Sequence, residues 1–202
     1  MMQYDCHEAL KKIHPKLNNL SNISLEDFLL IEPIVKIQEV KAGDFFLKAG
    51  SSSAHVALIL KGITKTYYIT ENGKEHITHF GIEGSFTGVY TQMLKKEPCT
   101  GDVKALERSI LLVMNYYELI DVTKTNLQWA HLLRRIAEER YVFRSEKERN
   151  ITLKTAQERY EYFIEKHPQL FARLPQQEIA LYLNITPATL SRLKNGTGKY
   201  KK

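Results

Sequence analysis

The chain has 202 residues, of which 43% are apolar, and carries a formal net charge of +6. This length suits one or two domains with substantial cores, and the apolar fraction is ordinary for a soluble protein. No apolar run approaches the roughly 20 residues of a membrane-spanning helix, and the first residues lack the apolar core of a signal peptide. We therefore expect a cytoplasmic protein with no membrane partner.

Charge is distributed unevenly along the chain. Residues 1–124 hold 14 Lys and Arg against 15 Asp and Glu, a net of −1, whereas residues 125–202 hold 15 against 8, a net of +7. A near-neutral front and a basic back are typical of a sensor joined to a nucleic-acid-binding module. The two cysteines, Cys6 and Cys99, are too few for a disulfide framework or a cluster of metal ligands.

The first 33 residues predict two helices. In residues 5–20, four apolar side chains recur at helical spacing, namely Ala9, Leu10, Ile13 and Leu17. Ser24 with Asp27 three residues later resembles the start of a second helix, with Ser24 as its N-cap. We expect Pro33 to end this helix.

From residue 34 to residue 115 the sequence predicts strands. Short apolar and β-branched runs (IVKIQEV, HVALIL, ITKTYYIT, EHITHF and SILLVM) are separated by glycines at 43, 50, 62, 73, 84 and 101. Asn72-Gly73 between two of these runs is a strong hairpin signal. Strands at this spacing without helices between them predict an antiparallel sandwich or barrel, and the whole chain is then of the α+β class.

A long helix follows, predicted over 125–150. Its apolar stripe has helical spacing and comprises Trp129, Leu132, Leu133, Ile136, Ala137 and Phe143. The stripe could lie on the chain's own barrel, or it could pack against a second copy in a coiled-coil-like seam. We favour a homodimer, because the stripe is wide enough to face both, with Trp129, Leu132, Leu133, Ile136 and Phe143 in the interface. Asn150 and the three residues after it should break the helix and form a hinge.

The last segment predicts a helix-turn-helix over Leu174–Asn195. A helix at residues 156–166 precedes it, with Tyr160, Phe163 and Ile164 on its inner face. Pro175 then suits a first helical turn, Asn184 a left-handed corner, and Thr186 with Pro187 the cap and first position of a second helix. Five apolar positions should close a small core: Ile179, Leu183, Ile185, Leu190 and Leu193.

The second helix should read DNA with its outer face. Ala188, Arg192 and Asn195 lie opposite Leu190 and Leu193, with Ser191 beside them. An arginine can bond a guanine edge in the major groove. A solvated surface hairpin is the plainer alternative. Backbone phosphates are expected to meet a second set of residues: Gln176, Thr186, Thr189, Lys194 and Lys199.

The segment QQEIALYLNITPATLSRLKN resembles the helix-turn-helix of the Crp/Fnr family of bacterial transcription regulators. KAGDFFLKAGS, LILKGITKTYY and ENGKEHITHFGIEGSF are similar in order to that family's cyclic-nucleotide-binding β-roll. The resemblance implies a β-roll sensor at residues 1–124, a dimerisation helix at 125–150 and a DNA-binding domain at 151–202. It also implies a winged-helix-like ending whose wing is truncated, because few residues follow the recognition helix.

The family's cyclic-AMP-binding members carry a Gly-Glu pair for the ribose and an Arg-Ser pair for the phosphate. Val89 stands at the glutamate position, and Thr100, Gly101 and Asp102 fall in the region of the Arg-Ser pair. A phosphate without a cation loses its main charge-assisted partner, so we expect no tight binding of cyclic nucleotides. If an effector binds, its expected pocket comprises Phe86, Thr87, Gly88, Val89, Tyr90, Cys99 and Thr100. The iron–sulfur-sensing branch needs about four cysteine ligands, and no cofactor is expected.

Two other classes of function are weighed against a regulator. A cupin-like metal enzyme is disfavoured, because His76 and His79 are three residues apart on one strand and point to opposite faces. An adaptor that has lost DNA binding is the other alternative, because Pro187 and Ala188 replace base-reading residues of well-known relatives. We expect no catalytic residues and no metal site. The expected partners are double-stranded DNA and a second copy of the chain, with RNA polymerase and a small-molecule effector left open.

Overall fold

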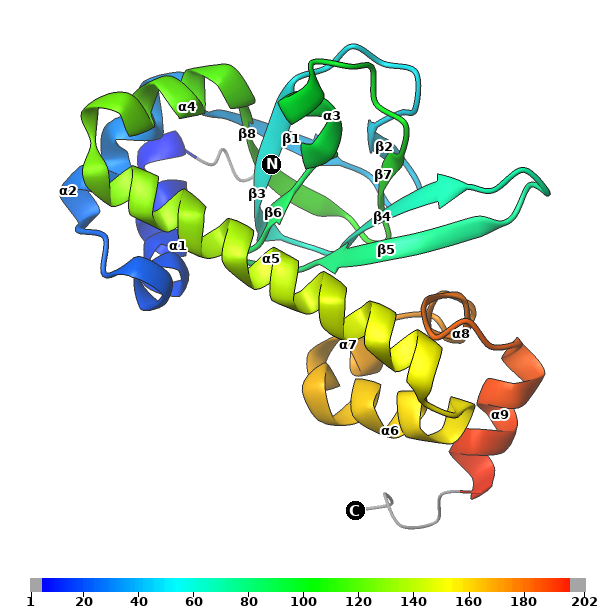
Figure 1. The fold of residues 1–202 in the computed structure, drawn as a ribbon. Coiled ribbons are helices and arrows are strands. Elements are labelled where there is room, and N and C mark those ends of the chain that lie inside the picture. The colour runs from blue at the N-terminus through cyan, green and yellow to red at the C-terminus, as the bar shows by residue number, and fades with distance from the viewer. Residues whose placement is uncertain (1–4, 197–202) are drawn as a thin grey trace. The chain divides into compact units, whose positions relative to one another are not determined.

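The computed structural model describes residues 5–196, and the chain forms two compact units (Figure 1). Unit 1 comprises Met1–Tyr68 and His79–Arg140, and unit 2 comprises Ile69–Thr78 and Tyr141–Lys202. Within residues 5–196 no helix is both long and apolar enough to cross a membrane.

Unit 1 begins with the helices α1 (Cys6–Ser21) and α2 (Leu25–Phe28), as the sequence predicts. The four apolar side chains expected on the inner face of α1 are all buried. Ser24 caps α2 by accepting a hydrogen bond from the backbone N–H of Asp27 at 3.0 Å. The expected stop at Pro33 is wrong. A 3-10 helix, η1 (Leu29–Ile34), runs through Pro33, which is compatible with the tighter turn of a short 3-10 segment.

The expected antiparallel β-roll is confirmed. Eight strands form two four-stranded sheets, in the orders β1-β8-β3-β6 and β2-β7-β4-β5. The paired registers in both sheets are antiparallel. The strand bounds are β1 (Lys36–Val40), β2 (Phe45–Leu47), β3 (His55–Lys61), β4 (Thr64–Ile69), β5 (Glu75–Gly81), β6 (Phe86–Thr87), β7 (Asp102–Ala105) and β8 (Ser109–Asn115).

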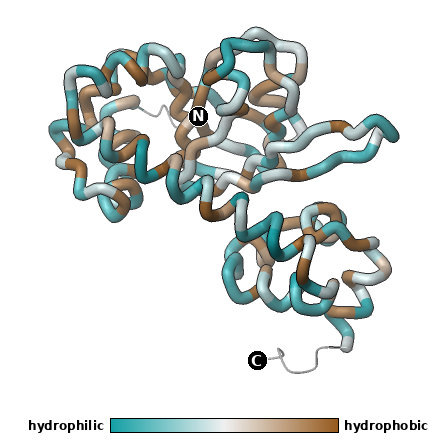
Figure 2. The backbone as a smooth tube through the Cα atoms, viewed as in Figure 1, coloured by the Kyte–Doolittle hydropathy of each residue, from teal (hydrophilic) through white to brown (hydrophobic). Residues whose placement is uncertain are grey.

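The centre of the roll lies at β3 and β8, which pair along most of their length and are buried in their interiors. Gly62, between β3 and β4, has φ +108°, and a Cβ atom there would lie 2.2 Å from Ser109 Oγ. Only glycine fits this close approach. The Asn72-Gly73 hairpin joins β4 to β5, with the N–H of Thr70 bonded to the carbonyl of Lys74 at 2.9 Å. Figure 2 shows that the tip of this hairpin is hydrophilic.

Three helices complete unit 1: α3 (Tyr90–Lys95), α4 (Tyr116–Thr125) and the first part of α5 (Leu127–Leu153). Trp129 is fully buried in α5; its indole stacks on Phe28 with ring centroids 5.3 Å apart, and its Nε1–H donates to the carbonyl of Asp27 at 2.8 Å. Leu132 is equally buried in the same core cluster, and Leu133 and Ile136 pack against it.

Trp129 and Leu132 are therefore unavailable to a dimer interface, whereas Leu133, Ile136 and Phe143 are half-buried and their place in an interface stays a prediction. Trp129 and Leu132 have no exposed surface to offer a second copy, and Leu133 and Ile136 face the same core. Phe143 lies in unit 2, where its ring meets that of His167 edge-on at 5.8 Å. The alternative, in which the helix packs against its own chain, is correct for Trp129 and Leu132. Burial of the indole within the chain is favourable because it removes apolar surface from water.

Unit 2 holds the rest of α5 and four shorter helices: α6 (Ala156–Lys166), α7 (Pro168–Arg173), α8 (Gln176–Tyr182) and α9 (Pro187–Gly196). The expected break at Asn150 is wrong, since α5 continues to Leu153. The break follows at Thr155, which forms a capping box with Glu158 and starts α6. The outer part of the β4–β5 hairpin also belongs to this unit, where Lys147 Nζ donates to the carbonyl of Ile77.

Candidate nucleic-acid interface

Local backbone chemistry makes the corner between α8 and α9. Asn184 adopts φ +53°, the left-handed conformation that asparagine tolerates better than most residues. The N–H of Ile185 then reaches back to the carbonyl of Ala180 at 3.0 Å. The sequence prediction of a left-handed corner at this residue is confirmed.

The start of α9 is capped as expected. The backbone N–H of Thr189 donates to Thr186 Oγ1 at 3.1 Å, and Pro187 takes the first helical position, where a missing N–H is tolerated. Leu190 is fully buried, with Ile179, Ala180 and Leu183 of the preceding helix and corner also buried. This small core fixes which side of α9 faces outward.

The outward side of α9 carries the predicted base-reading residues. Ala188, Ser191, Arg192 and Asn195 are all exposed. Arg192 Nη2 lies 3.4 Å from Thr189 Oγ1, a weak contact that leaves the guanidinium at the surface. The structure therefore places these four side chains on one accessible helical face, which is the geometry that a major groove accepts.

The residues predicted to contact DNA phosphates differ in their exposure. Gln176 and Thr186 are exposed, whereas Thr189 is half-buried and its hydroxyl lies 2.9 Å from that of Thr186. Lys194 is exposed, with its Nζ 5.5 Å from the centre of the Phe171 ring. Lys199 and the expected truncated wing lie outside the described residues.

The residues predicted to form an effector pocket differ in burial. Val89 and Cys99 are buried in one apolar cluster, and Phe86 belongs to another. Thr87 is buried and accepts a hydrogen bond from the Thr64 hydroxyl at 3.1 Å. Gly88 is half-buried, and Tyr90 and Thr100 are exposed.

Sequence reasoning missed Arg140. From α5, its guanidinium donates to the carbonyl of Phe86 in β6, and burial lowers the pKa of this arginine. From the sequence alone, a single arginine on an amphipathic helix is expected to be solvated. Only the tertiary fold brings Arg140 to β6. Asp102, which we expected to oppose a phosphate, instead accepts a hydrogen bond from the backbone of Ala49 at 2.8 Å.

Comparison with protein families matches residues 37–126 to the cyclic nucleotide-binding domain. A search of the curated proteins gave no match.

Similar solved structures extend the likeness to most of the chain. FixK2 from Bradyrhizobium japonicum has 16% identity and a TM-score of 0.70, with 82% of this chain and 85% of that chain covered. The c-di-GMP responsive global regulator CLP of Xanthomonas campestris has 14% identity and a TM-score of 0.67, with 85% and 89% covered. A protein described as a transcriptional regulator of the Crp/Fnr family, from Eubacterium rectale, has 14% identity and a TM-score of 0.66, with 87% and 83% covered. Residues 37–126 thus match the cyclic nucleotide-binding domain, and the chain has the fold of the Crp/Fnr family of transcription regulators.

Proposed function

We propose that the protein is a transcription regulator that binds double-stranded DNA as a homodimer and reads base edges with α9. The observation that carries this proposal is the exposed set Ala188, Ser191, Arg192 and Asn195 on a capped helix after a left-handed corner. Arg192 can bond a guanine edge, and the small side chains at 188 and 191 leave room for close approach. A cytoplasmic, non-enzymatic role fits this reading.

The electrostatic balance supports the same partner. Residues 125–202 carry a net charge of +7, and a basic surface raises affinity for the phosphate backbone without regard to sequence. Lys194 and Lys199 are assigned to such contacts, and Gln176 and Thr186 can donate to phosphates from the start of the two helices. RNA polymerase would be a further partner if the regulator activates transcription.

The dimer would use an exposed face of α5 that lies beside the buried face of Trp129. Exposed or half-exposed residues recur along it at alternating steps of three and four, the spacing of a coiled-coil seam: Leu127, Ala130, Arg134, Ala137 and Tyr141. Leu127 and Tyr141 are 68% and 74% exposed, an unusual position for large apolar side chains in a chain that has no partner. We refer to these five residues as the seam face.

We propose further that the sensor does not respond to cyclic nucleotides. Val89 is buried in an apolar cluster, and the Arg140 guanidinium is already bonded to the carbonyl of Phe86. A cyclic phosphate would therefore have to compete with an internal hydrogen bond for its cation. Calorimetry with cyclic AMP and cyclic GMP should give no saturable heat below millimolar concentration, and a micromolar affinity would contradict this proposal.

The DNA-binding proposal is tested on fragments selected from a pool of genomic DNA by the purified protein. Arg192→Ala should weaken binding to the selected operator by about 1–3 kcal/mol for each bidentate contact and relax the preference at one base pair of each half-site. Arg149→Ala, which removes an exposed arginine from α5, serves as the matched control. Unchanged operator affinity of Arg192→Ala, at unchanged melting temperature, would remove this residue from the interface. A protein that selects no fragments at all would contradict DNA binding itself.

A further inference from the structure

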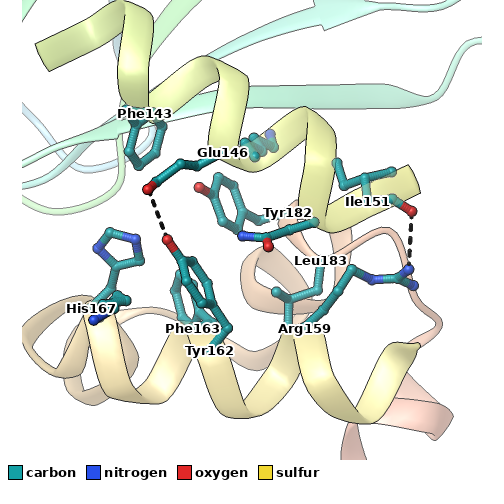
Figure 3. Close-up of a pocket in the computed structure, with 12 residues that line it drawn as sticks. Phe143, Glu146, Ile151, Arg159, Tyr162, Phe163, His167, Tyr182 and Leu183 are labelled. Atoms are coloured by element: carbon teal, nitrogen blue, oxygen red, sulfur yellow. Dashed lines mark hydrogen bonds between the residues drawn. The ribbon is translucent and has the colours of Figure 1, made fainter. Parts of the chain in front are cut away.

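Unit 2 has a cavity of about 260 Å³, partly open to solvent, between the C-terminal half of α5, α6 and the end of α8 (Figure 3). A volume of this size exceeds the share of a few water molecules and is slightly below the usual range of small-ligand pockets. The proposed function uses none of its lining residues. The cavity is therefore a separate feature of the unit that carries α9.

Aromatic rings form much of the cavity wall. Phe143 of α5 and Phe163 of α6 both lie against the imidazole of His167, with ring centroids 5.8 Å and 5.5 Å from it. Figure 3 shows Phe143 and Tyr162 projecting from the two facing helices, with Tyr182 behind them. A wall of this kind favours a flat, largely apolar occupant that can lie against ring faces or edges.

The charged lining is predominantly positive. Lys147, Arg159 and Lys166 contribute three cations, and Glu146 contributes one carboxylate. That carboxylate already accepts a hydrogen bond from the Tyr162 hydroxyl at 2.9 Å. Lys147 is likewise engaged, because its Nζ donates to Ile77 and lies 4.2 Å from the centre of the Tyr182 ring. The balance of charge favours an anion, and Arg159 is the cation best placed to meet it.

Two buried polar atoms in the lining lack a hydrogen-bond partner among residues 5–196. Arg159 donates through Nη1 to the carbonyls of Ile151 and Lys154, at 3.4 Å and 2.9 Å, but its Nε has no acceptor. Asn150 is 6% exposed, and its Oδ1 has no donor. Buried donors and acceptors are nearly always satisfied. An occupant that supplies an acceptor to Arg159 and a donor to Asn150 would satisfy both.

We propose that this cavity binds a small aromatic carboxylate that also carries a hydroxyl group. Its carboxylate would accept from Arg159, its hydroxyl would donate to Asn150, and its ring would lie among Phe143, Phe163 and Tyr182. Such a ligand would join α5 to α6 and α8 from within the DNA-binding unit.

Calorimetry with three matched probes tests the proposal on the full chain without DNA. Para-hydroxybenzoate carries both groups, benzoate lacks the hydroxyl, and para-hydroxybenzamide lacks the negative charge. We expect one-site, saturable binding of para-hydroxybenzoate below about 10 mM, and each of the other probes to bind about tenfold more weakly. No saturable binding of para-hydroxybenzoate, or equal affinities for all three probes, would overturn the proposal and leave a cavity that holds only water.

Variants then connect the binding to the two unsatisfied atoms. Arg159→Gln should weaken para-hydroxybenzoate about tenfold, whereas Arg149→Gln, an exposed arginine outside the lining, should not change its affinity. Because Arg159 also holds two backbone carbonyls, Asn150→Leu provides a second test that retains them. This variant should fold and bind benzoate as well as it binds para-hydroxybenzoate. A preserved preference for the hydroxylated probe in Asn150→Leu, or full affinity in a folded Arg159→Gln, would contradict the assignment.

Discussion

At the scale of single residues, Trp129 ties the long helix to the N-terminal helices. It is the largest fully buried side chain among residues 5–196 and combines stacking on Phe28 with a hydrogen bond to the backbone of Asp27. Asn126 adds a second link to the same segment, since its Nδ2 donates to Asp27 Oδ1 at 2.6 Å. These contacts fix the start of α5 on its own chain.

Trp129→Ala should lower the free energy of unfolding of unit 1 by about 3–5 kcal/mol, because it leaves a large cavity and removes the hydrogen bond to the carbonyl of Asp27. Trp129→Phe should cost less, since it keeps the stacked ring and loses mainly the hydrogen bond. Urea unfolding followed by far-ultraviolet circular dichroism measures both. A loss below about 1 kcal/mol for the alanine variant would show that this residue is not part of the core.

Lys147 makes the stability of unit 2 depend on pH. Burial lowers its pKa from the ordinary value of 10.5 to about 8. The unfolded chain therefore binds this proton more tightly than the folded one. Between pH 8 and pH 10.5 the unfolded state carries more protons, so the free energy of unfolding rises with pH across this window. Below pH 8 the penalty for burying the charge is present in full.

The Lys147→Met variant isolates this effect, because methionine fills a similar volume without a charge. We expect wild-type stability to increase relative to that of Lys147→Met as the pH is raised from about 7.5 to 10. Chemical denaturation at several pH values measures the difference, and subtracting the variant removes the contribution of tyrosines that titrate in the same range. A flat difference would mean that this ammonium is well solvated.

At the scale of elements, the corner between α8 and α9 depends on one backbone conformation. Asn184 has φ +53°, which glycine adopts freely and a β-branched residue strongly disfavours. Asn184→Gly should leave the melting temperature nearly unchanged, whereas Asn184→Val should destabilise unit 2 by about 1–2 kcal/mol. Circular dichroism is the suitable probe, because the single tryptophan lies in unit 1. Equal stability of the two variants would show that the corner relaxes to another conformation.

The elements that the sequence predicts well are those with long or chemically marked patterns. The periodicity of α1, the hairpin at Asn72-Gly73 and the helix-turn-helix are of this kind. The sequence does not predict the short strands β2, β6 and β7 separately. Each has only two to four residues, which is too short to show the alternation of apolar and polar residues that marks a strand. Pro33 and Asn150 mislead for another reason. Both are weak helix formers, yet η1 includes Pro33 and α5 continues through Asn150.

At the scale of the whole molecule, α5 has one face buried against its own chain and one exposed face. Helical periodicity reveals how wide an apolar stripe is, but not which surface it meets, so the stripe around Trp129 could be assigned equally well to the chain or to a partner. Arg140 and the cavity residues also depend on tertiary structure, because they come together from segments far apart in the sequence. The exposed face of α9 could be predicted, since local helix geometry alone determines it.

Ala137→Glu on the seam face tests whether the dimer uses the exposed side of α5. Ala137 is exposed, so a glutamate there should change the free energy of unfolding by less than about 0.5 kcal/mol. In a two-fold dimer the same charge would occur twice in one seam, and the like-charge repulsion with its desolvation should dissociate the dimer. Light scattering at micromolar concentration measures the mass.

Glu139→Arg, which changes an exposed charge outside the seam face, should leave the dimer intact. A dimeric Ala137→Glu variant, or a monomeric wild-type protein, would contradict the proposed seam. A monomeric but stable Ala137→Glu variant should also lose most of its operator affinity, because each copy then binds a single half-site without its partner.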